Sequence, residues 1–157
     1  MEAFFRYLMC VFLLALAPSC FAQAVTIRVI NAVDGRPLQK QHVSVSLLYD
    51  KGERAPANYE PNLSGETDAN GEMQIRIPEP APAHFSVMVN LTSEHWRCGC
   101  WVMGVTQDLI QKGIVGPQPR AKSEKSDAAI KAVPGEILIL ARPFSFLERL
   151  LYPFVKG

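Results

Sequence analysis

Hydrophobic and polar residues alternate in several short stretches of this chain, and a period of two is typical of strands that bury one face. In the first stretch, Val25, Ile27 and Val29 are separated by polar or charged residues. The last stretch, EILILA, is apolar at almost every position and predicts a strand that is covered on both faces. The predicted strands cover residues 25–30, 43–49, 72–78, 84–91 and 136–141. Short strands separated by turn residues predict an all-β fold, an antiparallel sandwich of two sheets.

Helical patterns are confined to two short segments. TQDLIQKG predicts a short helix with Thr106 as its N-cap and Gly113 just past its last turn. The tail, residues 143–157, predicts a short amphipathic helix in which Ser145 and Glu148 form a capping box. Its apolar stripe either packs on the sandwich or makes a peripheral contact with a membrane surface or a partner.

Two regions show little strand pattern. Residues 51–66 are polar and rich in Pro, Gly and Asn, so they predict a long loop. Apart from the short predicted helix, residues 93–135 predict a variable loop between the fourth and fifth strands.

The start of the chain has the plan of a secretory signal peptide, with a short head that carries one arginine, an apolar run and then small residues. The apolar run is too short for a permanent membrane span, so we expect a signal peptide at 1–22, with cleavage after Ala24 as the alternative. Lipidation of Cys20 is disfavoured because Ala17 stands where a leucine is usual. The mature protein is therefore expected to be exported, to the periplasm or to the extracellular space.

Two polar fragments, DGRPL and TDANG, hold turn residues at a distinctive spacing. These turn residues are Asp34, Gly35, Pro37, Thr67, Asp68 and Gly71. Their order resembles that of carboxypeptidase regulatory-like domains, which are transthyretin-like (prealbumin-like) β-sandwich modules of exported proteins. The resemblance covers residues 24–92, and it implies an Ig-like or transthyretin-like sandwich over residues 23–142. In this family pattern the residues are structural, and the TDANG fragment is expected to close a hairpin.

Three positions depart from that family pattern. Lys40 stands where the family favours glycine, Gln41 where it favours a small apolar residue, and Met73 where it favours an aromatic residue. The resemblance therefore bears on the fold and implies little about activity.

Charge and missing motifs argue against several functional classes. A net charge of +1 over 157 residues, with scattered lysines and arginines, argues against nucleic-acid binding. The chain has no G-x-S-x-G, no P-loop and no dinucleotide fingerprint. Intradiol dioxygenases and hydroxyisourate hydrolases, which have related sandwiches, need paired histidines, whereas His42, His84 and His95 are widely separated. Without a catalytic constellation, we predict that the protein is not an enzyme.

The segment HWRCGCW, residues 95–101, holds the only two cysteines that remain after signal-peptide cleavage. His95, Cys98 and Cys100 offer one imidazole and two thiolates, which suit zinc or copper if a fourth ligand comes from elsewhere. Alternatively, Cys98 and Cys100 form a disulfide across Gly99, which an oxidising compartment favours.

A third interpretation of HWRCGCW is packing, and it is the one the sequence favours. Trp96 and Trp101 would cover the end of the core, and the thiols would pack as small hydrophobic groups. His42 and His84 are expected to be surface residues.

The predicted function follows from the family resemblance. We expect a non-catalytic exported module that binds an unknown protein or glycan, or has a structural role, at the cell envelope. The alternative is a periplasmic metal- or redox-active protein that uses His95, Cys98 and Cys100. No cofactor is expected beyond zinc or copper at that segment.

Overall fold

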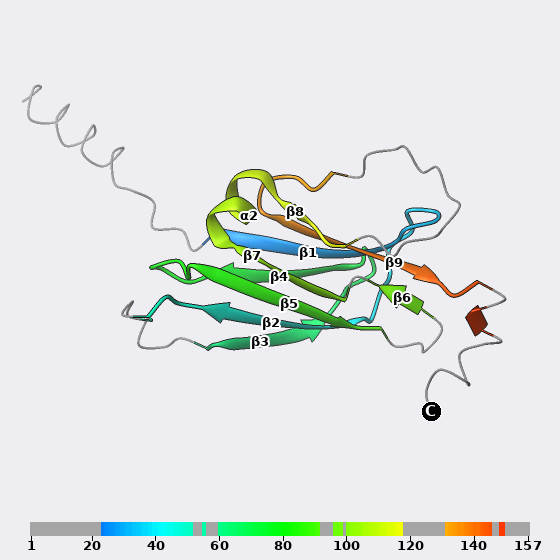
Figure 1. Cartoon of the computed structure of the whole chain (residues 1–157), viewed down its shortest axis with the longest axis horizontal. Helices are drawn as coiled ribbons and strands as arrows, with labels where there is room; N and C mark the ends of the chain where they lie inside the picture. The colour runs from blue at the N-terminus through cyan, green and yellow to red at the C-terminus, as the bar shows by residue number, and fades with distance from the viewer. Residues whose placement is uncertain are drawn as a thin grey trace, which may run out of the picture.

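The computed structural model describes residues 23–51, 55, 60–91, 96–98, 100–117, 131–145 and 148–149. In these residues the chain forms two β-sheets packed face to face, with a short helix, α2 (Thr106–Lys112), beside them (Figure 1). The strands are β1 (Gln23–Asn31), β2 (His42–Leu48), β3 (Asn62–Glu66), β4 (Glu72–Ile77), β5 (His84–Asn90), β6 (Trp96–Cys98), β7 (Trp101–Val105), β8 (Ile114–Val115) and β9 (Glu136–Pro143). The predicted all-β sandwich is confirmed.

The two sheets differ in their strand directions. Sheet A has the order β4-β1-β9-β6, with β8 also pairing with β9, and sheet B has the order β3-β2-β5-β7. Sheet B is antiparallel throughout its described strands, whereas β9 runs parallel to both β1 and β8 in sheet A. The predicted antiparallel sandwich therefore contains two parallel pairings, both made by β9. The first and last described strands are far apart in sequence, so a long connection can bring them together in the same direction.

Alternation along the strands places the core between the sheets. Val25, Ile27 and Val29 of β1 are fully buried, as their spacing predicts. On β9 every residue from Glu136 to Arg142 is buried, which agrees with a strand covered on both faces. The core cluster consists of Val25, Ile27, Val29, Val43, Val45, Leu47, Ile75, Ile77, Phe85, Val87, Val89, Val102, Leu109, Ile137 and Ile139.

Strands also form where the sequence predicts loops. β3 lies inside the predicted loop 51–66, and the predicted variable loop 93–135 contains β6, β7, α2 and β8. β3 and β7 are the two edges of sheet B, and β6 and β8 are short strands paired with β9. Edge strands are half-exposed and take their hydrogen bonds from a distant neighbour, so their local hydrophobic pattern is weak.

The DGRPL fragment forms a tight turn after β1. The N–H of Gly35 donates to the carbonyl of Asn31 (2.8 Å), and Gly35 has φ +71°. The Asp34 carboxylate accepts a hydrogen bond from the N–H of Arg36 (3.0 Å). Pro37 forms an isolated bridge with Ile30, which returns the chain to the sandwich edge.

The TDANG fragment does not close a hairpin. The strand before it, β3, pairs with β2 in sheet B, and the strand after it, β4, pairs with β1 in sheet A. The turn therefore carries the chain from one sheet to the other. The hairpin prediction failed because each strand finds a longer partner in its own sheet.

Side-chain hydrogen bonds of Thr67 and Asp68 fix this crossing turn in place. The Thr67 hydroxyl accepts from the N–H of Gln41 (3.0 Å) and donates to the carbonyl of Leu38 (2.7 Å). One oxygen of Asp68 accepts from two backbone N–H groups of the turn (2.8 and 2.9 Å). Gly71 has φ +72°, and a Cβ at this position would lie 2.6 Å from the carbonyl oxygen of Val29.

The helix α2 begins one residue earlier than predicted. Its N-cap is Val105, and Thr106 is the first helical residue, with its side chain buried at 2% exposure. Thr106 cannot cap the helix because β7 runs directly into it, and its hydroxyl has no hydrogen-bond partner among the described residues. Gly113 ends the helix as predicted, with φ +71° and its N–H donating to the carbonyl of Leu109 (3.0 Å).

The start of the tail shows the predicted capping box. The N–H of Ser145 donates to Glu148 Oε2 (2.8 Å), and the N–H of Glu148 approaches Ser145 Oγ at 3.4 Å. Glu148 also forms two hydrogen bonds of 2.8 Å with the guanidinium group of Arg142 on β9. The remainder of the predicted tail helix and the predicted signal peptide 1–22 lie outside the described residues.

Candidate functional site

The outer face of sheet B carries the most exposed large hydrophobic side chains that the structure describes in one place. On β7, Trp101, Met103 and Val105 point away from the core and are 62%, 58% and 42% exposed, while Val102 points inward. Met88 on the neighbouring strand β5 is 46% exposed. We name these four residues (Met88, Trp101, Met103 and Val105) the apolar patch.

Cross-strand pairing makes the patch continuous. Trp101 lies opposite Met88 in the β5–β7 register, and Met103 lies opposite Ser86. The indole Nε1–H of Trp101 donates to the Ser86 hydroxyl at 2.7 Å. This hydrogen bond satisfies the polar atom of the indole and holds the ring on β5, so the exposed surface of Trp101 is mainly its apolar ring.

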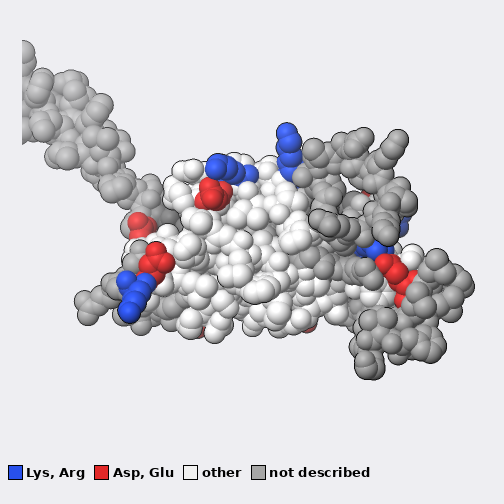
Figure 2. Space-filling model, in the orientation of Figure 1, with Lys and Arg blue, Asp and Glu red and all other residues white. Residues whose placement is uncertain are grey.

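The face around the patch carries almost no charge. Among the residues of β2, β3, β5 and β7 the only Lys, Arg, Asp or Glu is Glu66, at the end of β3. In Figure 2 the broad central surface over β5 and β2 is correspondingly free of charged side chains, which lie at its margins. The cores of protein interfaces are depleted in charge and enriched in Trp and Met, so this face has the composition of a contact surface.

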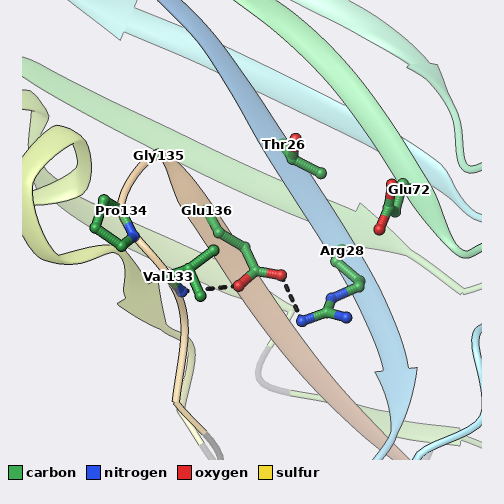
Figure 3. Close-up of a pocket in the computed structure, with 7 residues that line it drawn as sticks. All are labelled: Thr26, Arg28, Glu72, Val133, Pro134, Gly135 and Glu136. Carbon is green, nitrogen blue, oxygen red and sulfur yellow. Dashed lines mark hydrogen bonds and ion pairs between the residues drawn. The ribbon is translucent and has the colours of Figure 1, made fainter.

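The outer face of sheet A is built differently. It holds an open pocket of about 270 Å³ lined by Thr26, Arg28, Glu72, Val133, Pro134, Gly135 and Glu136 (Figure 3). Arg28 Nη2 and Glu136 Oε1 are 2.6 Å apart, and the other carboxylate oxygen of Glu136 accepts from the N–H of Val133 (2.9 Å). The Glu136 side chain is only 6% exposed, and both of its oxygens are engaged. This pair therefore joins β1 to β9 and to the preceding loop, which is a structural role.

The pKa of Glu148 reflects a second ion pair on β9. The hydrogen bonds from Arg142 and from the N–H of Ser145 lower the pKa of Glu148 from 4.5 to about 2. The Arg142 side chain is 10% exposed and that of Glu148 is 22% exposed, so the pair is partly shielded from water. It fixes the start of the tail to the end of β9.

The segment HWRCGCW is only partly described. His95 and the side chain of Cys98 lie outside the described residues. Cys100 is half-buried and disulfide-bonded, and its carbonyl accepts from the N–H of Val89 (2.8 Å). A sulfur in a disulfide is not a thiolate ligand, so in this form Cys100 offers nothing to zinc or copper. The pairing of Cys98 with Cys100 and the metal site with His95 both stay predictions.

Packing is the wrong interpretation for one of the two tryptophans. Trp96 is half-buried, but Trp101 is the most exposed of the large hydrophobic residues that the structure describes. Trp101 begins β7, and the alternation of that strand turns Val102 inward and Trp101 outward. The pattern W-V-M-G-V contains this alternation, but both alternating sets are apolar, so the sequence alone does not show which set is buried.

The remaining histidines are on the surface, as predicted. His42 is exposed at the start of β2, and His84 is exposed at the start of β5, with its Nε2 3.6 Å from Asp50. Within the described part of the chain no three His, Cys, Asp or Glu residues gather in a way that could hold a metal ion. In the same part, no helix has the length and apolar character needed to cross a membrane.

Comparisons with known proteins give one distant likeness. No family model matches the chain, and no curated protein matches its sequence. A solved structure, the group B streptococcus pilus 2b backbone protein, aligns with 79% of this chain at a TM-score of 0.42 and 10% sequence identity. The chain spans 42% of the length of that protein. A likeness at this level carries no functional argument, and the resemblance to carboxypeptidase regulatory-like domains stays a prediction.

Proposed function

We propose that this protein is a non-catalytic, exported β-sandwich module that binds a protein partner at the cell envelope through the outer face of sheet B. The apolar patch is the observation that supports this proposal. Its four side chains lie on two neighbouring strands, are between 42% and 62% exposed, and stand on a face with a single charged residue. Water covers this surface in the free protein, and a partner that removes the water gains the hydrophobic free energy.

The chemistry of the two outer faces favours binding over catalysis. Two ionisable groups of the sheet A pocket, Arg28 and Glu136, are paired with each other, and each Glu136 oxygen already has a partner. On the sheet B face, His84 lies opposite Val105 of the apolar patch with its Nε2 3.6 Å from Asp50, and the Ser86 hydroxyl accepts the indole N–H of Trp101. A surface of this kind recognises shape and apolar area, as protein interfaces do.

Site-specific photo-crosslinking tests the proposal. A benzophenone-bearing amino acid is placed at Met103 in the full chain, expressed in its native host, and a matched variant carries it at Gln74. Gln74 is exposed on β4, on the opposite sheet. We expect discrete adducts from position 103 and none of the same mass from position 74. No adduct at position 103, or the same adducts from both positions, would contradict the proposal.

A second candidate function is redox activity at Cys100. The supporting observation is that Cys100 is disulfide-bonded and directly precedes Trp101 of the apolar patch. Mass spectrometry of the purified mature protein after non-reducing digestion should identify a Cys98–Cys100 bridge, and thiol titration against glutathione should give its reduction potential. A stoichiometric metal that is lost in Cys98→Ser would instead support the metal site with His95.

A further inference from the structure

Three of the four residues of the apolar patch lie on β7, at one edge of sheet B. β7 is the last strand of sheet B, and the described residues provide no further strand beside it. The N–H of Val89 donates to the carbonyl of Cys100, and the N–H of Thr106 donates to the carbonyl of Ala83. Both bonds fit one register, in which the even-numbered residues of β7 bond to β5. The odd-numbered residues therefore direct their backbone groups away from β5, toward the open side.

The groups on this open side are a ready template for another strand. They are the N–H groups of Trp101, Met103 and Val105 and the carbonyl groups of Trp101 and Met103. The carbonyl of Val105 faces into the first turn of α2, of which Val105 is the N-cap. No hydrogen bond from the described residues satisfies the open-side groups along β7. The same odd-numbered residues supply the exposed apolar side chains. The open-side backbone groups and the apolar side chains therefore lie at the same edge.

The two edges of sheet B differ in the features that prevent strand pairing. β3, at one edge, follows Pro61 and ends at the charged Glu66, with exposed polar Asn62 and Ser64 between them. β7, at the other edge, contains no proline, no charged residue and no break in its register with β5. Prolines, charges and bulges are the usual means by which edge strands avoid pairing with another chain. Their presence on β3 and absence from β7 single out β7 as a pairing edge.

We infer that β7 pairs antiparallel with β7 of a second copy of this chain, across a two-fold axis at Met103. This inference rests on the proposed function and specifies its partner. In this arrangement Met103 lies opposite its own copy, and Trp101 lies opposite Val105 of the other copy. The N–H and carbonyl of Met103 bond to the same groups of its copy, and the N–H of Val105 donates to the carbonyl of Trp101. The open-side groups named above are thus used, except the N–H of Trp101, whose partner carbonyl serves α2.

Charge is the reason for choosing a second copy as the occupant. A two-fold axis brings each residue close to its own copy, so any charge near the axis meets a like charge. β7 and the patch are uncharged, so self-pairing has no such penalty. The side chains on the paired strands have suitable sizes, since a large Trp101 faces a smaller Val105 on the same side of the extended sheet. An extended segment of a different protein is the competing occupant, and the experiment separates the two.

Sedimentation velocity of the purified mature protein over a range of concentrations tests the dimer. We expect a monomer–dimer equilibrium in which Met103→Lys raises the dissociation constant at least roughly tenfold, because two ammonium groups then meet at the axis. The conservative variant Met103→Leu should stay within about threefold of the parent, and so should Gln74→Lys, because Gln74 is exposed on β4 in the other sheet and lies outside the apolar patch. Circular dichroism and thermal unfolding of each variant check that the sandwich is intact.

Hydrogen–deuterium exchange gives a second readout that does not depend on a substitution. The amides of Trp101, Met103 and Val105 point to the open side, and those of Met103 and Val105 should become protected as the protein concentration rises. The Trp101 amide and the edge amides of β3 should not. A monomer at all concentrations, a dimer that Met103→Lys leaves unchanged, or edge amides that never gain protection would overturn the inference.

The crosslinking experiment at Met103 distinguishes failure of this inference from failure of the proposed function. An adduct of twice the mass of the chain supports the second copy. A discrete adduct of another mass leaves sheet B as a contact surface and overturns the second copy as its occupant. No adduct at position 103, together with a monomer in sedimentation, overturns both.

Discussion

The outer faces of the two sheets carry side chains with different roles, although the same strand alternation places both sets. On sheet A, the outward positions of β1 and β9 include Arg28 and Glu136, which are joined at 2.6 Å and hold a loop to the sheet. On sheet B, the outward positions of β5 and β7 include Met88, Trp101 and Met103, which touch water and hold nothing in place beyond their own strand pair. A substitution in the Arg28–Glu136 pair should therefore affect folding, and one in the apolar patch should affect association.

The largest effect is expected from breaking the ion pair on sheet A. Arg28→Met leaves the Glu136 carboxylate, which is 6% exposed, without its cation and should lower the free energy of unfolding by about 3 kcal/mol. Arg76→Met, at an exposed position of the neighbouring strand β4, is the matched control and should change it by less than about 0.5 kcal/mol. Urea unfolding of both variants measures the difference. Equal values for the two variants would show that the Arg28–Glu136 pair does not stabilise the fold.

The next largest loss of stability is expected at the turn that carries the chain from sheet B to sheet A. Gly71→Ala places a Cβ 2.6 Å from the carbonyl oxygen of Val29 at φ +72°, so we expect a loss of about 2–3 kcal/mol. Gly35→Ala shares the positive φ, but its Cβ meets nothing within 4 Å, and it should cost about 1 kcal/mol. Thermal or urea unfolding distinguishes the two. If both variants lose the same amount, the close approach of the turn to β1 is unimportant.

A smaller, pH-dependent effect is expected at the start of the tail. The pKa of Glu148 is lowered from 4.5 to about 2, so its contribution to stability is complete above pH 4.5 and is lost as the pH falls toward 2. Glu148→Gln should cost about 1 kcal/mol near neutral pH, and the difference from the parent should shrink at low pH. Asp108→Asn, which removes an exposed ion pair with Lys112, should cost less than about 0.5 kcal/mol. A Glu148→Gln penalty that is independent of pH would contradict the assignment.

The smallest effect on stability is expected on the outer face of sheet B. Trp101→Thr removes a ring that is 62% exposed and keeps a residue suited to strands, so unfolding should change by less than about 1 kcal/mol. The same variant should lose the contact made by the apolar patch, which the crosslinking and sedimentation experiments measure. A loss comparable to that of Arg28→Met would mean that Trp101 is part of the core support and would remove the contrast between the faces.

Local pattern was a good guide where a strand has one clearly apolar face. The alternation in 25–30 and 84–91 identified the buried sides of β1 and β5, and the apolar run 136–141 identified β9 as a strand covered on both faces. Gly113 marked the end of α2, and Ser145 with Glu148 marked the capping box. These features depend on interactions within a few residues or on burial against a large core, both of which leave a strong trace in the sequence.

The candidate surface could not be found in the same way. W-V-M-G-V is apolar at every position apart from glycine, so it fits a buried strand, a loop that packs on the core, or an edge strand equally well. Trp101 was predicted to cover the end of the core together with Trp96, whereas the structure places it on the surface. Only the register between β5 and β7 shows that Met88 lies beside Trp101.

By itself, the sequence determined the fold class, the buried faces of the long strands and the turns at Gly35, Gly71 and Gly113, because these follow from side-chain period and from backbone conformations that favour glycine. Only the tertiary structure decided which sheet each strand joins. It sent the TDANG turn from sheet B to sheet A, placed β9 parallel to β1, and left β7 at an open edge with Trp101 outward. Strand pairing joins residues that are far apart in the chain. Its energy depends on neighbouring strands, which a local sequence pattern does not identify.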